Sequence, residues 1–166
     1  MSRTTFAFIV EKLYTWSMNT STEIRAGRYV LFQLQVHLVF VTKYRREAIS
    51  ERVFLVLKEA FEEVCKDFEG QLVESNYEED HVHLLVGYPP KVALSRLINS
   101  LKGVSSRLLR AKKYEEVEKK LWGKHFWSPS YCAVSCGGAP LEVLKRYIEN
   151  QREPNPGRGH KKRVKK

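Results

Sequence analysis

The chain has 166 residues and a mass of 19.4 kDa, which is the size of one compact domain. The net charge of +10 favours a polyanionic partner, with nucleic acid ahead of a membrane surface. The longest early apolar stretch, residues 6–10, is too short for a membrane span or a signal-peptide core, and 43% hydrophobic residues exclude wholesale disorder.

The first predicted strand covers residues 31–42, after an extension at residues 1–23 that shows no clear hydrophobic period at its start and is expected to be flexible. Alternate residues of the strand would form its core face, namely Phe32, Leu34, Val36, Leu38 and Phe40. A helix is predicted next, because Ser50 suits an N-cap and apolar residues then recur at helical spacing up to Phe68. Gly70 stands where a C-terminal cap is expected.

The sequence after residue 70 predicts two further strands, a long helix and three shorter elements. The strands, 71–77 and 82–87, would flank a turn at Glu78, Glu79 and Asp80. The long helix, 92–111, contains Gly103 as an interior weak point. The shorter elements are a helix over 114–121, a strand over 130–135 and, after Gly137 and Gly138, a last helix over 140–152.

This order of elements predicts an α+β fold. The succession β-α-β-β-α-β matches a ferredoxin-like or RRM-like antiparallel sheet, to which the C-terminal helix is added. Such a sheet would carry its helices on one face and leave the other face open. We expect the domain to span residues 24–152, followed by a basic tail at 153–166 that is rich in proline and glycine.

Positive charge is concentrated in two segments. Residues 152–166 contain seven basic residues and one acidic residue, and residues 91–113 contain seven basic residues and none that is acidic. Residues 62–80 are the opposite, with eight acidic residues and one lysine. The sequence therefore combines a basic helix and a basic tail with an acidic middle segment.

The three cysteines, Cys65, Cys132 and Cys136, indicate a cytoplasmic protein with reduced thiols, because their number is odd and no secretion signal is evident. Cys132 and Cys136 lack a second pair of ligands that would complete a zinc site. We expect them to be core or turn residues.

A pair of histidines begins the strand His81-Val82-His83-Leu84. Alternation places both imidazoles on one face, so they could ligate a divalent ion. The alternative is two solvent-facing histidines on a half-exposed strand. On the last predicted helix, Tyr147 and Gln151 share a face, and a half-buried tyrosine without a chemical role is the alternative there.

Together these motifs resemble the HUH single-tyrosine transposases of the insertion sequence 200/605 family, whose members are TnpA-like. The resemblance spans roughly residues 24–152. It lies in four segments: His37-Leu-Val-Phe-Val-Thr-Lys-Tyr-Arg-Arg46, Asp80-His-Val-His-Leu-Leu-Val86, Leu121-Trp-Gly-Lys-His-Phe-Trp-Ser-Pro-Ser-Tyr131 and Tyr147-Ile-Glu-Asn-Gln151.

The resemblance implies a metal-dependent DNA transesterase that cleaves and rejoins single-stranded DNA at hairpin-bearing element ends through a 5′-phosphotyrosine. It implies Tyr147 as the nucleophile and His81, His83 and Gln151 as the groups that hold Mg²⁺ or Mn²⁺. It also implies a homodimer in which the tyrosine of one subunit serves the histidine pair of the other, in the cytoplasm of a prokaryotic cell and without a membrane partner.

Basic side chains near these motifs are candidates for contact with the DNA backbone: Lys43, Arg45, Arg46, Lys102, Arg107 and Arg110. The alternative for the helical ones is a solvated helix face. Trp122, Phe126, Trp127 and Tyr131 could stack on unpaired bases, but core packing or dimer contact would explain them equally well.

Two other functions remain open at this point. One is a related HUH nickase, either a replication initiator or a domesticated repeat-associated transposase. The other is a non-catalytic RRM-like binding module, which usually shows paired aromatic residues on its central strands.

Overall fold

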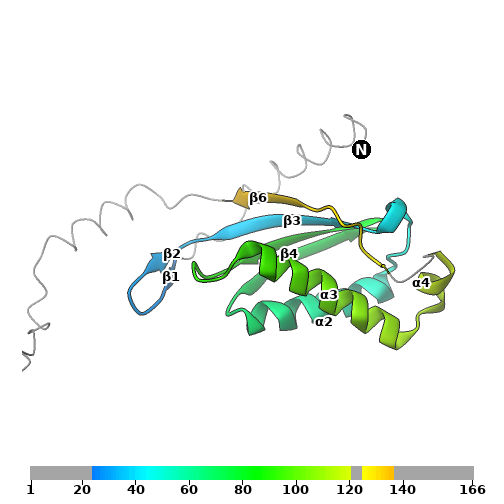
Figure 1. The fold of residues 1–166 in the computed structure, drawn as a ribbon, viewed down its shortest axis with the longest axis horizontal. Coiled ribbons are helices and arrows are strands. Elements are labelled where there is room, and N and C mark those ends of the chain that lie inside the picture. The colour runs from blue at the N-terminus through cyan, green and yellow to red at the C-terminus, as the bar shows by residue number, and fades with distance from the viewer. Residues whose placement is uncertain (1–23, 121–124, 137–166) are drawn as a thin grey trace, which may run out of the picture.

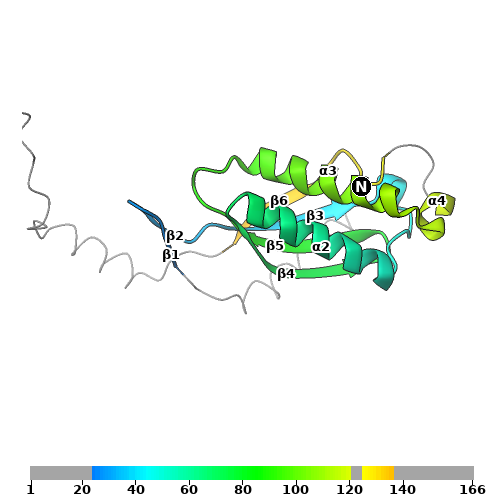
Figure 2. The same ribbon diagram turned by 90° about the horizontal axis from the view of Figure 1, so that it is seen from below.

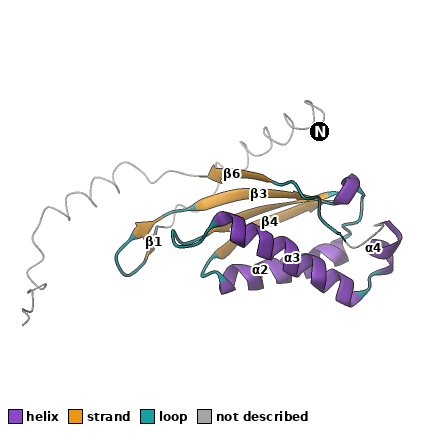
Figure 3. Cartoon of the chain, in the orientation of Figure 1, coloured by secondary structure: helices purple, strands orange, loops and turns teal. Residues whose placement is uncertain are grey.

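A computed structural model describes residues 24–120 and 125–136. Two long helices lie side by side on one face of a four-stranded sheet, as two perpendicular views show (Figures 1 and 2). These helices are α2 (Glu51–Asp67) and α3 (Leu94–Lys112), and α4 (Glu115–Lys120) follows at one end of the sheet (Figure 3). No helix in the described ranges is long and apolar enough to cross a membrane.

The sheet contains β3 (Gln35–Val41), β4 (Gln71–Glu78), β5 (His81–Gly87) and β6 (Cys132–Cys136). Their order is β4-β5-β3-β6, and all neighbours are antiparallel. This is the order of a ferredoxin-like sheet, in which the first and third strands are central. The α+β fold predicted from the sequence is therefore confirmed.

The core lies between the sheet and the two helices. The central strands contribute alternate residues that are at most 2% exposed: Val36, Leu38, Phe40, Val82, Leu84 and Val86. They pack against Leu57 and Phe61 of α2 and against Leu101 of α3. The strict alternation of β3 and β5 therefore decides which side chains face the helices and which face away.

The face away from the helices is less open than the alternation predicted. His37, Val39 and Leu85 lie on this face by register, yet each is at most 4% exposed. On this face the rings of His37 and His83 have centroids 5.4 Å apart. Burial lowers the pKa of His37 to about 4, so this imidazole is neutral at pH 7.

The predicted strand 31–42 is in fact two strands. β2 (Leu31–Phe32) pairs with β1 (Arg25–Ala26) in a separate two-stranded sheet, and β3 begins only at Gln35. Leu34, predicted for the core face, is 39% exposed. The alternation of apolar and polar residues runs through both strands in the sequence. This pattern indicates which side of a strand a residue faces, but it does not indicate which strand pairs with which.

The ends of α2 follow the predicted capping only in part. The Oγ of Ser50 accepts a hydrogen bond from the backbone N–H of Val53 at 3.3 Å, which confirms the N-cap. At the other end Glu69, and not Gly70, adopts the left-handed conformation, with φ of 53°. Gly70 instead allows close packing, since a Cβ atom there would lie 2.8 Å from the carbonyl oxygen of Gly87.

The remaining elements agree with the sequence to within about two residues, which is the usual spread at element ends. The cysteines are free thiols, with Cys65 and Cys136 buried and Cys132 half-buried. The predicted turn at Gly137 and Gly138 and the predicted helix 140–152 lie outside the described residues. The extension at 1–23 and the tail at 153–166 also lie outside them, so the domain limits stay a prediction.

Candidate functional site

The histidine pair lies at the start of β5, at the end of the sheet where the β3–α2 turn and α4 are found. His81 and His83 face away from the helices, whereas Val82 between them is fully buried in the core. The side chain of His81 is 9% exposed, so the reading of two solvent-facing histidines fails for this residue.

The two imidazoles face each other through their outer nitrogens. The Nε2 atoms of His81 and His83 are 3.1 Å apart, and the rings meet edge to face with centroids 4.9 Å apart. Two adjacent ligands of an octahedral magnesium ion are about 3 Å apart, because each bond is close to 2.1 Å. The pair therefore has the spacing that two ligands of one ion need.

Asp80 orients the first imidazole. Its Oδ1 lies 2.5 Å from Nδ1 of His81, and its Oδ2 accepts a hydrogen bond from Nε of Arg45 at 2.7 Å. A carboxylate at Nδ1 favours the tautomer with its proton on that nitrogen, which leaves a lone pair on Nε2, toward His83. Asp80 therefore orients the His81 ring from its Nδ1 side, which is the side away from His83.

The charge state of Asp80 suits this role. Burial alone would raise the pKa of its carboxyl group, but hydrogen bonds from His81 and Arg45, together with electrostatic attraction to these two side chains, outweigh burial and lower that pKa below its usual value. Asp80 is therefore ionised at neutral pH. Thr42 anchors the same turn, because its backbone N–H donates to the Asp80 carbonyl oxygen at 2.9 Å.

Glu78 adds a carboxylate on the Nε2 side of His81. The hairpin register pairs Glu78 of β4 with His81 of β5, and its Oε2 lies 3.9 Å from Nε2 of that histidine. Ligand atoms of Glu78, Asp80 and His81 all lie within 4.8 Å of one another. Imidazole and carboxylate donors together form a group that could hold a divalent metal ion.

Sequence reasoning assigned Glu78 and Asp80 only to a turn. The signal that could have found them is the hairpin itself, because a two-residue connection between β4 and β5 sets Glu78 opposite His81 and leaves Asp80 next to it. Tyr147 and Gln151, the other two predicted site residues, lie outside the described residues.

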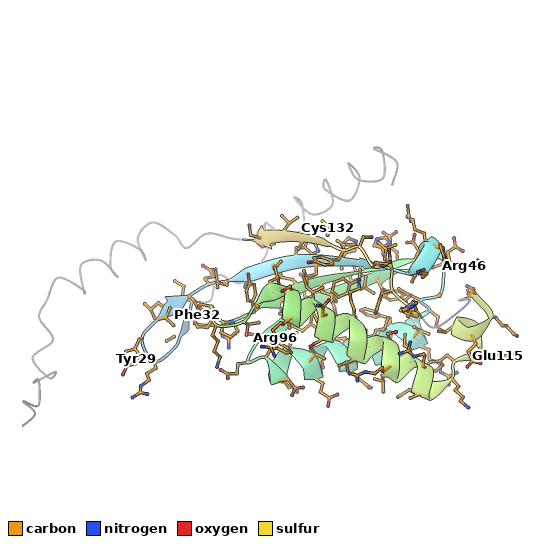
Figure 4. The ribbon with its side chains drawn as sticks, in the orientation of Figure 1. Tyr29, Phe32, Arg46, Arg96, Glu115 and Cys132 are labelled. Carbon is orange, nitrogen blue, oxygen red and sulfur yellow. The ribbon has the colours of Figure 1, made fainter. Side chains whose placement is uncertain are left out.

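The predicted DNA-contacting residues divide into two groups in space. Lys43, Lys102, Arg107 and Arg110 line one groove beside α3. Arg45 is engaged with Asp80, and Arg46 is exposed at the α4 end of the sheet, far from the β1–β2 hairpin that carries Tyr29 (Figure 4). Their contact with DNA stays a prediction.

The backbone of the turn that carries Lys43, Arg45 and Arg46 is unusual. Tyr44 and Arg45 both adopt left-handed conformations, with φ of 61° and 55°. This conformation is uncommon for residues other than glycine, and it brings the Arg45 side chain back to Asp80. Tyr44 itself remains 73% exposed.

Most of the described aromatic residues near the site belong to the core. Phe126 and Trp127 are about 5% exposed, and the Trp127 ring packs against both Phe40 and Phe126. Nε1 of Trp127 donates to the Oγ of Ser105 at 3.0 Å. Core packing, the alternative to base stacking, is therefore confirmed for these two. Tyr131 is 46% exposed, and Trp122 lies outside the described residues.

A search against family models matches residues 30–151 to the family described as "Transposase IS200 like". Among curated proteins, the ISDra2 transposase TnpA of Deinococcus radiodurans is 30% identical over 79% of this chain and 93% of its own length. The transposase for insertion sequence element IS200 of Salmonella typhimurium is 29% identical over 70% of this chain and 76% of its own length.

Solved structures give a similar result. A transposase from Deinococcus radiodurans superposes with a TM-score of 0.60 at 30% identity, covering 76% of this chain and 97% of that one. A structure described as a REP-associated tyrosine transposase bound to a REP hairpin matches with a TM-score of 0.48 at 13% identity, covering 75% of this chain and 68% of that one.

Proposed function

Since the chain belongs to the family of IS200-like transposases, we propose that it cleaves and rejoins single-stranded DNA at hairpin-bearing ends of an insertion element. The observation that carries this proposal is the histidine pair, with its Nε2 atoms 3.1 Å apart and one ring oriented by Asp80. Two adjacent imidazoles, one of them held by a carboxylate, are an arrangement that supports the binding of a cation.

Tyr147 is the proposed nucleophile. Its phenol oxygen would attack a backbone phosphorus, forming the tyrosyl O–P bond while the bond from phosphorus to the 3′ oxygen breaks. The phenol loses its proton, and the departing 3′ oxygen becomes a hydroxyl group. The phosphotyrosine linkage conserves the energy of the broken phosphodiester bond. A 3′-hydroxyl can therefore attack its phosphorus, release the tyrosine and rejoin the DNA without ATP.

The residues proposed to hold the cation are His81, His83 and Gln151, with Glu78 as an additional carboxylate at 3.9 Å from His81. A bound Mg²⁺ or Mn²⁺ would polarise the scissile phosphate. Asp80 and Arg45 would keep the His81 ring in place, because their ion pair ties the β3–α2 turn to the histidine strand.

The sheet gives little support to the RRM-like alternative. The described face away from the helices carries His37, Val39 and Val41 on β3 and His81, His83 and Leu85 on β5. An RRM stacks bases on aromatic rings of its central strands, and none of these six is phenylalanine, tyrosine or tryptophan. Family membership and this face together favour the transposase over the binding module.

The decisive experiment is trapping of the covalent intermediate. The protein is incubated with a hairpin-bearing single-stranded oligonucleotide and Mn²⁺, and products are separated in SDS. We expect the unmodified chain to form an adduct with the 5′ phosphate of the fragment downstream of the break, and Tyr147→Phe to form none. An adduct that persists in Tyr147→Phe would overturn the assignment of the nucleophile.

His81→Ala separates chemistry from binding. We expect this variant to lose cleavage while retaining affinity for the hairpin oligonucleotide, since the pair would act on the scissile phosphate alone. Asp67→Asn serves as a surface control, because Asp67 is exposed on α2. Loss of hairpin binding in His81→Ala would instead make the pair a structural element.

We also propose that the active unit is a homodimer with sites shared between subunits. A mixture of His81→Ala and Tyr147→Phe chains tests this arrangement. In a mixed dimer, shared sites would bring the intact tyrosine of one subunit to the intact histidine pair of the other, so cleavage would return. If each subunit used its own tyrosine, the mixture would stay inactive.

A further inference from the structure

A second site lies beside α3, on the helical side of the sheet. It is an open groove of about 920 Å³ between α3, Lys43 of the β3–α2 turn and residues 125–129. Its described lining includes the basic side chains Lys43, Lys102, Arg107, Arg110 and His125 and contains no carboxylate. A concave surface with this charge attracts a polyanion.

The cations of the groove have different tasks. The ammonium of Lys102 donates to the backbone oxygens of Ser128 and Pro129, at 2.6 and 3.1 Å, so it holds the groove wall against α3. Arg107 and Arg110 lie about one turn apart on α3 and are exposed. No hydrogen bond or ion pair engages Arg107 within the described ranges, and a guanidinium in this position suits a phosphate oxygen.

Gly103 is one of the residues that line the groove. It stands inside the 19-residue helix α3, where glycine is about 1 kcal/mol less favourable than alanine, yet a Cβ atom there would meet nothing within 4 Å. Neither packing nor backbone conformation requires glycine at this position. The absence of a side chain at Gly103 leaves open space in the groove wall, which Asn99 and Ser106 also line.

We propose that this groove binds an unpaired nucleotide of the DNA, with its base against the backbone at Gly103 and its flanking phosphates on Arg107, Arg110 and Lys43. Asn99 and Ser106 offer hydrogen-bonding groups for the base edge. A flat base needs such a recess, whereas a duplex presents its phosphates on a convex surface and keeps its bases stacked inside.

The position of the groove fits a strand that continues to the histidine pair. Lys43 follows β3 by two residues, and the last residue of β3, Val41, pairs with His81. The groove and the histidine pair therefore lie at the same end of the sheet on opposite faces, with the β3–α2 turn between them. This inference rests on the proposed function, because it takes single-stranded DNA as the substrate.

Binding without cleavage tests the groove. Fluorescence anisotropy in EDTA measures the affinity for a labelled oligothymidylate of about 12 nucleotides. Gly103→Leu should weaken this affinity about tenfold, because the leucine fills the recess. Ser95→Leu, which adds the same side chain at an exposed position of α3, should leave it unchanged. Equal affinities for both variants, with both folded by circular dichroism, would overturn the proposal.

Two further arms identify the ligand. Arg107→Gln should reduce the slope of log affinity against log salt by about 0.7, and Lys58→Gln, at an exposed position of α2, should not. An unlabelled duplex of equal length should compete poorly, and efficient competition by the duplex would refute the single-strand reading.

The outcomes separate this proposal from the proposed function. If the phosphotyrosine adduct forms normally and Gly103→Leu leaves binding unchanged, the groove proposal is wrong and the proposed transposase activity stands. If Gly103→Leu weakens binding but the unmodified chain forms no adduct, the groove proposal is supported and the proposed cleavage reaction is wrong.

Discussion

Asp80 and His81 are adjacent in sequence, and their side chains are joined by a contact of 2.5 Å between Oδ1 and Nδ1. Adjacent residues on a strand point to opposite faces, so this contact exists only because Asp80 is still in the turn when β5 begins at His81. The carboxylate can therefore reach the ring that the strand directs away from the helices.

Asp80→Asn should weaken cation binding by about 10- to 100-fold, the usual effect of losing a carboxylate behind a histidine ligand. The amide removes the negative charge that favours the proton on Nδ1 of His81, so Nε2 becomes a poorer ligand. Titration of Mn²⁺ followed by electron paramagnetic resonance measures the affinity without any DNA. Asp67→Asn, on the surface of α2, is the matched control, and equal affinities in the two variants would contradict this role.

Ser105→Ala should lower the free energy of unfolding by about 1–2 kcal/mol. The change leaves Nε1–H of buried Trp127 without the acceptor that lies 3.0 Å away. Urea denaturation measures the loss. In a Trp127→Phe background the same substitution should cost much less, because the indole N–H is absent; an equal cost in both backgrounds would show that the hydrogen bond is not responsible.

Gly70→Ala and Gly103→Ala should change stability in opposite directions. A Cβ atom at Gly70 would lie 2.8 Å from the Gly87 carbonyl oxygen, so the end of β5 must move, at about 1–3 kcal/mol. A Cβ atom at Gly103 meets nothing within 4 Å, so alanine should stabilise α3 by up to about 1 kcal/mol. Urea midpoints that shift in the same direction for both variants would refute this assignment of the two glycines.

Cys65 should make the protein less stable in alkali. Burial, with a smaller effect from the negative charge of Glu62, raises the pKa of this thiol from 9.0 to about 12. The unfolded chain therefore loses its thiol proton first, and the stability present below pH 9 decreases as the pH rises toward 12. Between pH 8 and 10 this group should remove about 1.4 kcal/mol, a loss that Cys65→Ala should not show in urea titrations.

Most of the fold could be predicted from the sequence because its helices and strands follow the periodic spacing of apolar residues. The alternation of β3 and β5 and the helical spacing of α2 and α3 are local patterns that mirror burial, and they led to the observed order of elements. Pairing is not local, which is why residues 31–32 were joined to β3 although they pair with residues 25–26.

The same distinction applies to the site. The motif His81-Val82-His83 determined by itself that two imidazoles share one face, since alternate residues of a strand must do so. It could not determine that Asp80 and Arg45 hold one ring, or that Glu78 stands opposite it, because those contacts depend on a hairpin register and on a left-handed turn.

The net charge of the chain shows most clearly what a sequence cannot predict about individual side chains. The sequence alone gave a positive chain and pointed to nucleic acid, because charge is a sum over residues. Only the tertiary structure decided what each cation does: Lys102 binds backbone carbonyls and Arg45 binds Asp80, whereas Arg107 and Arg110 line a groove. The reason is geometric, since the partner of a long flexible side chain is chosen by whatever the fold brings within hydrogen-bonding distance.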